Sequence, residues 1–95
     1  MEISLSGSTA TITGNIKSVS DYQKIKSTLD SFIANGNNVT LKIKDSISIT
    51  SSVIGYFNKL ILKDKVKFSL HVGNAQLMEL LDELNLISVF HVQKV

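Results

Sequence analysis

The sequence predicts a small α/β domain with a mixed, mainly parallel sheet, because segments of two different periodicities alternate along it. Short runs of alternating apolar and polar residues are separated by longer runs with helical periodicity, in the order β-β-α-β-α-β-α-β. Strands that alternate with helices are typical of right-handed crossovers between parallel strands. The first two strands follow each other directly, so we expect an N-terminal antiparallel hairpin in an otherwise parallel sheet.

The expected hairpin comprises residues 2–6 and 9–13, with Ser6-Gly7-Ser8 as its turn. A first helix follows, for which Ser18 or Ser20 can serve as the N-cap and Asn35-Gly36 as the stop. Its apolar residues fall on one helical face, which we expect to be buried: Tyr22, Ile25, Leu29, Phe32 and Ile33.

The third strand is expected at residues 39–43, and a polar loop over residues 45–50 leads into the second helix. This helix begins near Ser51 and ends around Lys63-Asp64. Its expected buried stripe consists of Val53, Ile54, Phe57, Leu60 and Ile61.

The last third of the chain repeats the strand-helix-strand pattern. Residues 66–72 alternate as a fourth strand, Asn74 can cap the third helix, and Asn85 can close it. Residues 87–92 are expected to form a last short strand. The third helix is expected to bury four leucines: Leu77, Leu80, Leu81 and Leu84.

Length and composition favour one folded domain over residues 1–95. Hydrophobic residues make up 43% and charged residues 19%, which excludes disorder. No apolar run approaches the roughly 18 residues of a membrane span, and no secretory signal is visible at the N-terminus. The lack of Cys excludes disulfides and thiolate metal sites. We therefore expect a cytoplasmic protein without direct membrane insertion.

The charge pattern argues against a nucleic-acid partner. The net charge is only +2, and all ten basic residues are dispersed lysines, so no arginine can contact bases or phosphates through two parallel hydrogen bonds. The chain also has no Trp and few other aromatic residues on which bases could stack.

Little in the sequence indicates catalysis. His71 and His91 are the two histidines, and they have no metal-binding spacing. The glycines are isolated, so neither a G-x-G-x-x-G loop nor a P-loop is present. The acidic residues Glu79, Asp82 and Glu83 are typical of a solvated helix face. We expect no enzyme activity, no metal and no cofactor.

The unusual segment is Thr50-Ser51-Ser52, where three hydroxyls precede an apolar helix. In one interpretation one of them caps the helix and the others only solvate the loop. In the other interpretation a serine here is a phosphorylation switch. A helix N-terminus tolerates an anion, and a phosphate would place nearly two negative charges on a docking surface.

The sequence resembles the STAS domain family, which contains the anti-sigma-factor antagonists. The family signature D-S-S/T-G-L-G, between the third strand and second helix, is similar to Thr50-Ser51-Ser52-Val53-Ile54-Gly55. Upstream, Thr11-Ile12-Thr13-Gly14-Asn15-Ile16 is similar to the family strand that ends in G-E-L-D. Downstream, Gly73-Asn74, a leucine-rich helix and Asn85-Leu86-Ile87 follow the family pattern as well. The resemblance implies a single STAS-like domain.

This resemblance implies a non-catalytic switch in bacterial transcription regulation. Ser51 matches the serine that is phosphorylated by a partner kinase, which also acts as the anti-sigma factor. Phosphorylation would block binding, and a phosphatase would restore it. Thr50, Ser52, Val53 and Tyr56 would line the docking surface, although Tyr56 is alternatively a partly exposed helix residue that only packs.

Three departures from the family pattern keep an alternative open. Thr50 replaces the signature Asp, Val53 replaces its first Gly, and Lys17 stands where G-E-L-D has its acid. The alternative is a non-switching STAS subunit or scaffold of a larger complex, such as a lipid-transport ATPase. The exposed edge of the opening hairpin also permits a homodimer.

Overall fold

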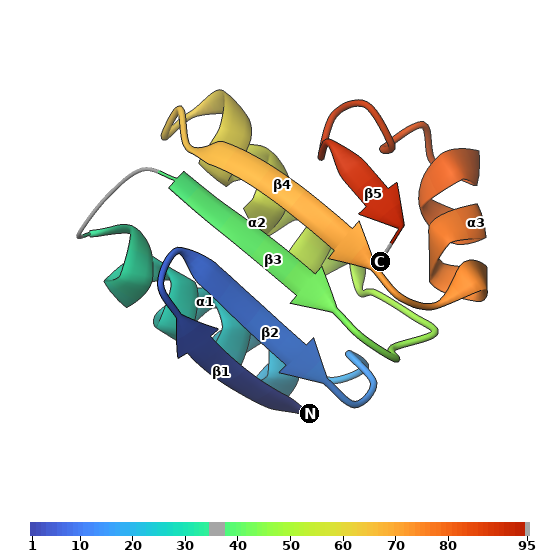
Figure 1. Ribbon diagram of the computed structural model, residues 1–95, viewed down its shortest axis with the longest axis horizontal. Helices are drawn as coiled ribbons and strands as arrows, with labels where there is room; N and C mark the ends of the chain where they lie inside the picture. Colours follow the sequence, from blue (N-terminus) through green and yellow to red (C-terminus); the bar gives the residue numbers. More distant parts are fainter. Residues whose placement is uncertain (35–37, 95) are drawn as a thin grey trace.

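A computed structural model of the chain describes residues 1–34 and 38–94. It contains a five-stranded sheet whose strand order, β1-β2-β3-β4-β5, follows the chain (Figure 1). The strands are β1 (Glu2–Ser6), β2 (Thr9–Thr13), β3 (Asn38–Ile43), β4 (Lys67–Val72) and β5 (Val92–Lys94). The helices are α1 (Val19–Ile33), α2 (Ser51–Leu62) and α3 (Ala75–Glu83).

The predicted order of elements and the mixed sheet are confirmed. β1 pairs antiparallel with β2, and each later strand pairs parallel with the strand before it. The hairpin turn fits its sequence, because Gly7 has a φ of 59° while Ser8 is not among the residues of positive φ. Glycine at the first central position is the requirement of a type II′ turn, which matches the twist of the paired strands.

The three helices contribute to one hydrophobic core on one face of the sheet. A sheet whose parallel strands are added in chain order by right-handed crossovers receives all its helices on the same side. Figure 1 shows α1 and α2 behind the sheet and α3 beside β5. The centre of the core is aromatic: the Phe57 ring lies 4.9 Å from that of Phe68 and 5.7 Å from that of Phe90, between centroids.

The opposite face of the sheet is polar and, among the described residues, is covered by no helix. Parallel sheets are usually covered on both faces, so an open face is uncommon. Its side chains include two long rows that cross the strands. One row contains Ser4, Thr11, Lys42, His71 and Gln93, and the other contains Ser6, Thr9, Thr40 and Ser69.

The prediction of a strand over residues 87–92 is wrong. Residues 87–91 form turns, with Phe90 N–H donating to the Leu86 carbonyl and Val92 N–H to the Ile87 carbonyl. This coiling buries the Phe90 ring in the core, and parallel pairing with β4 begins only at Val92. The chain therefore turns at residues 87–91 instead of extending, and the Phe90 ring enters the core.

Two smaller expectations are settled by local geometry, and a third is not tested. Ser18, rather than Ser20, caps α1. Leu84, expected to be buried, is 47% exposed because α3 has already ended at Glu83. The expected stop at Asn35-Gly36 lies outside the described residues.

The described helices include none that is both long enough and apolar enough to span a bilayer.

Candidate functional site

The start of α2 uses one of its three hydroxyls as a cap. Thr50 has extended backbone angles, and its Oγ1 accepts a hydrogen bond of 3.3 Å from the Val53 N–H. Ser51 and Ser52 are the first two residues of α2 and are exposed. Their hydroxyls make no hydrogen bond within residues 1–34 and 38–94. Two serines are therefore free at a helix start whose cap is already in place.

The loop before α2 is anchored by a serine that the sequence analysis missed. Ser46 is fully buried, and its Oγ accepts from the Ile16 N–H at 3.0 Å while donating to the Ser48 carbonyl at 2.7 Å. The Ser48 hydroxyl in turn donates to the Ile16 carbonyl at 2.9 Å. These bonds join the loop before α2 to the loop before α1.

Two further hydrogen bonds join the same loops near β2. The Gly14 N–H donates to the Asp45 carboxylate at 2.7 Å, and the Ile47 N–H donates to the Asn15 side-chain oxygen at 3.1 Å. Both loops follow the carboxyl ends of neighbouring parallel strands, where open α/β sheets commonly bind ligands and partners. These hydrogen bonds consequently hold the start of α1 next to the start of α2.

The start of α1 is capped reciprocally. The Asp21 N–H donates to the Ser18 hydroxyl at 3.1 Å, and the Asp21 carboxylate accepts from the N–H groups of Lys17 and Ser18 at 3.0 and 3.2 Å. This arrangement is a capping box. The hydrogen bond from the Lys17 N–H is the main cause that lowers the pKa of Asp21, with further contributions from Ser18.

A small hollow of about 130 Å³ lies between the two helix starts. It is lined by residues of both: Lys17, Ser18, Val19, Tyr22, Thr50 and Ser52. Val19 is 72% exposed, so a large apolar side chain stands on the surface next to hydroxyls and a lysine. The hollow is smaller than the roughly 300 Å³ at which small-molecule pockets begin.

The structure brings together three of the five residues expected at the site. Thr50, Ser51 and Ser52 lie at or near the surface, whereas Val53 is fully buried and Tyr56 is only 4% exposed. The expectation that Val53 and Tyr56 line a docking surface is corrected accordingly, because both side chains point into the core that α2 covers. Residues at the start of α1, among them Val19 and Tyr22, line the hollow beside Thr50 and Ser52 instead.

Tyr56 has a packing role. Its hydroxyl donates to the Asp30 carboxylate at 2.6 Å, and the same carboxylate receives Lys26 at 2.8 Å. Burial is the main cause that raises the pKa of Tyr56, and the hydrogen bond to Asp30 adds to it. This contact joins α2 to α1.

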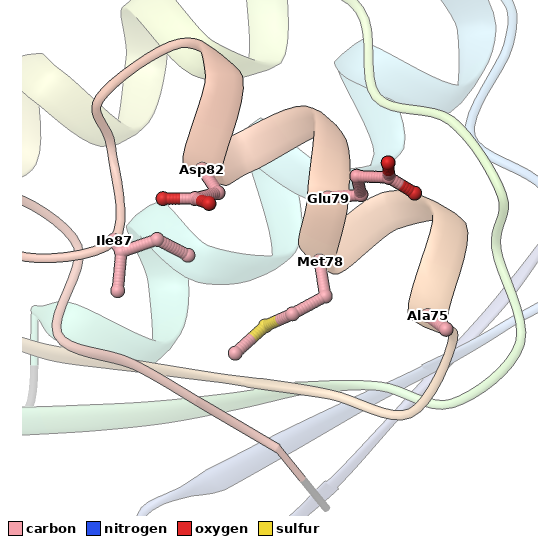
Figure 2. A pocket seen from close by; sticks show the side chains of 5 residues that line it. All are labelled: Ala75, Met78, Glu79, Asp82 and Ile87. Atoms are coloured by element: carbon pink, nitrogen blue, oxygen red, sulfur yellow. The ribbon is translucent and has the colours of Figure 1, made fainter.

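A second hollow, of about 390 Å³, lies on α3. Ala75, Met78 and Ile87 line it together with two acids, and Figure 2 shows the Glu79 and Asp82 carboxylates pointing away from each other. In the described part of the chain no group of three or more His, Cys, Asp or Glu side chains is placed to hold a metal ion.

Comparisons with known proteins support the fold. No family model matches the chain, and no curated protein matches its sequence. The fold is similar to that of a solved structure described as the NMR structure of the protein TM1081, with a TM-score of 0.68. The similarity covers 98% of this chain and 79% of the other, at 17% sequence identity. At this identity the likeness shows a shared α/β fold.

Proposed function

We propose that this chain is a non-catalytic, cytoplasmic protein-interaction domain whose docking surface is controlled by phosphorylation of Ser51. One observation carries the proposal: the Ser51 hydroxyl is exposed and free in the first turn of α2, while Thr50 supplies the cap. The proposed docking surface consists of Lys17, Val19, Ser51 and Ser52. Resemblance to the STAS family suggests a serine kinase with anti-sigma-factor activity as the partner, and a phosphatase as its opponent.

A phosphate at Ser51 would leave the fold intact. The first turn of α2 contains no acidic residue, so the positive end of the helix dipole has no negative side chain beside it. Phosphorylation adds between one and a half and two negative charges at pH 7. The helix tolerates these charges, but a partner packed over Ser51 would have to bury them. Binding is therefore weakened without unfolding.

The direct test is intact mass spectrometry of the protein isolated from its native host, with fragmentation to locate any modification. A single phosphate on Ser51 supports the proposal. A phosphate on Ser52 alone would keep regulation but contradict the assignment. An unmodified protein under all growth conditions tried would contradict phosphorylation as the control.

A binding test compares charge inside and outside the proposed docking surface. Wild type, Ser51→Ala, Ser51→Asp and the matched control Ser27→Asp, at an exposed serine of α1 outside that surface, are each used to capture the partner from host extract. We expect Ser51→Asp alone to lose at least tenfold of the captured kinase, as expected from burying an unpaired charge. Equal capture by Ser51→Asp and Ser51→Ala would refute the switch.

A second candidate function is a non-switching subunit or scaffold of a larger complex, such as a lipid-transport ATPase. The open polar face of the sheet favours it, because a parallel sheet with one bare face offers a broad surface for a permanent partner. This candidate predicts that partner binding is insensitive to charge at Ser51 and sensitive to substitutions such as Thr11→Glu or Lys42→Glu on that face.

A further inference from the structure

We infer that two copies of this chain associate through their β1 strands, which pair antiparallel about Ser4 and join the two sheets into one. The inference concerns a different part of the molecule from the proposed phosphorylation switch and does not depend on it. Among the described residues β1 has a strand neighbour on one side only, and Figure 1 shows it at the border of the sheet.

The β1 edge has no bulge, no proline and no lysine to protect it from pairing with another strand. All five of its residues pair with β2 in unbroken register, so no bulge bends the strand away. Natural edge strands are often protected by Lys or Pro. This chain has no Pro, and its first lysine is Lys17. The opposite edge is different, because β5 has only three residues and contains Lys94.

The hairpin geometry fixes which backbone groups of β1 point outward. A two-residue turn makes its flanking residues, Ser6 and Thr9, a hydrogen-bonded pair. Hydrogen-bonded and non-hydrogen-bonded pairs then alternate along the ladder, so Ile3 and Leu5 carry the N–H and C=O groups that face away from β2.

One antiparallel register uses all of these outward groups. With Ser4 opposite its own symmetry mate, Ile3 of each copy exchanges two hydrogen bonds with Leu5 of the other. This pairing has twofold symmetry and forms a closed dimer. A slip of two residues in one direction would oppose Ile3 to itself and leave Leu5 beside Met1, which precedes the strand. A slip in the other direction would oppose Leu5 to itself and leave Ile3 beside the turn residue Gly7.

The side chains match in the same register. Leu5 is 50% exposed and lines a hollow of about 410 Å³ together with Ser6, Gly7, Ser31 and Phe32. Pairing about Ser4 places Ile3 of the second copy beside Leu5, on the apolar side of both sheets. An exposed leucine above a half-buried Phe32 is thereby covered by a β-branched residue, which favours cross-strand packing.

The charges are compatible with self-association. Glu2 is the one charged side chain of β1, and in this register it lies opposite Ser6 of the second copy. Ser4 lies opposite Ser4. Like charges therefore do not face each other, although like-charge repulsion is the common obstacle when identical strands pair. A second copy is the occupant that the edge fits.

Cysteine cross-linking tests the register. The chain has no Cys, so Ser4→Cys and Ser6→Cys each introduce a single thiol on the exposed face of β1. We expect oxidised glutathione to convert most Ser4→Cys protein to a disulfide-linked dimer, because non-hydrogen-bonded pairs bring Cβ atoms close together. Ser6→Cys, which faces Glu2, should link at least fivefold more slowly. Equal linking of the two variants, or none, would overturn the inference.

Sedimentation velocity over a concentration series tests the association itself. We expect wild type to approach twice the monomer mass of 10.4 kDa as concentration rises. Leu5→Lys should remain monomeric, whereas Leu62→Lys, at a more exposed leucine on α2, should behave as wild type. Circular dichroism serves as the control that Leu5→Lys is folded. A monomeric wild type at millimolar concentration, or a Leu5→Lys dimer, would contradict the inference.

Discussion

The first turns of α1 and α2 line one hollow, yet their backbone N–H groups are satisfied differently. At α1, Ser18 and Asp21 cap each other, so the helix begins with a carboxylate already bonded to backbone N–H groups. At α2, Thr50 makes a single bond of 3.3 Å to the Val53 N–H, and the first turn has no acid.

The two helix starts therefore differ in whether a further negative charge would find backbone N–H groups without a charged partner. The negative charge that stabilises a helix N-terminus is built into α1 and absent from α2. A phosphate added at Ser51 would therefore place a negative charge at the start of α2, as the Asp21 carboxylate does at the start of α1. The comparison also explains why one serine cluster is a candidate switch while Ser18 is a structural cap. Four substitutions test it, in decreasing order of expected effect.

The largest effect is expected for Ser46→Ala, which breaks the link between the two helix starts. The buried Ile16 N–H would lose its partner, and an unsatisfied buried donor costs about 2 kcal/mol. Denaturant unfolding followed by circular dichroism measures the loss. Ser48→Ala is the matched control and should cost about 1 kcal/mol, since its half-buried hydroxyl bonds to the Ile16 carbonyl. A smaller loss for Ser46→Ala than for Ser48→Ala would contradict this account of the loops.

The cap of α2 gives the next effect. Thr50→Ala should lower the free energy of unfolding by about 1 kcal/mol, because the Val53 N–H loses its acceptor. Ser51→Ala should change it by less than about 0.5 kcal/mol, as expected for an exposed surface position. Equal losses for the two variants would mean that the capping role is shared between them.

Ser51→Asp should stabilise the fold slightly. A carboxylate in the empty first turn of α2 interacts favourably with the helix dipole, by about 0.3–1 kcal/mol at low ionic strength. Thermal or denaturant unfolding at low and high salt measures the gain, which salt should reduce. Leu62→Asp, at the other end of α2, should have the opposite sign. Destabilisation by Ser51→Asp would show that the start of α2 does not tolerate a negative charge.

The smallest effect concerns pH at the α1 start. The pKa of Asp21 is lowered in the folded protein by the Lys17 and Ser18 hydrogen bonds. Its contribution is therefore present above the unfolded pKa of about 3.9 and is lost as pH falls through the folded value. Asp21→Asn should remove this part of the acid sensitivity, measured by unfolding between about pH 2 and 5. Unchanged acid sensitivity in Asp21→Asn would contradict the capping box.

Much of the fold could be predicted because periodicity reports which side of an element is buried. In β3 and β4 every second residue is apolar, and those residues are buried in the structure. The failure at residues 87–91 arose where this rule does not apply. The buried ring there is the single Phe90, and a turn places it in the core as well as a strand would.

The candidate site was only partly predictable, since its arrangement depends on contacts between distant residues. Three adjacent hydroxyls indicate a helix start, but only the extended backbone of Thr50 identifies the cap. Ser46 bonds to a residue 30 positions away, and no local pattern distinguishes it from its solvated neighbours. For Tyr56 the sequence left docking and packing open, because no local pattern shows the hydrogen bond of its hydroxyl to Asp30 on another helix.

The agreement between strand order and chain order has a consequence for how the domain is assembled during synthesis. Each strand pairs with the one translated just before it, so every emerging strand meets a template that already exists. The hairpin can form first from local contacts alone, and each β-α unit then extends it by one position. No strand has to be inserted between two others. The nascent chain therefore extends the sheet at one edge only. Among the described strands β5, with three residues, is the last one added at that edge.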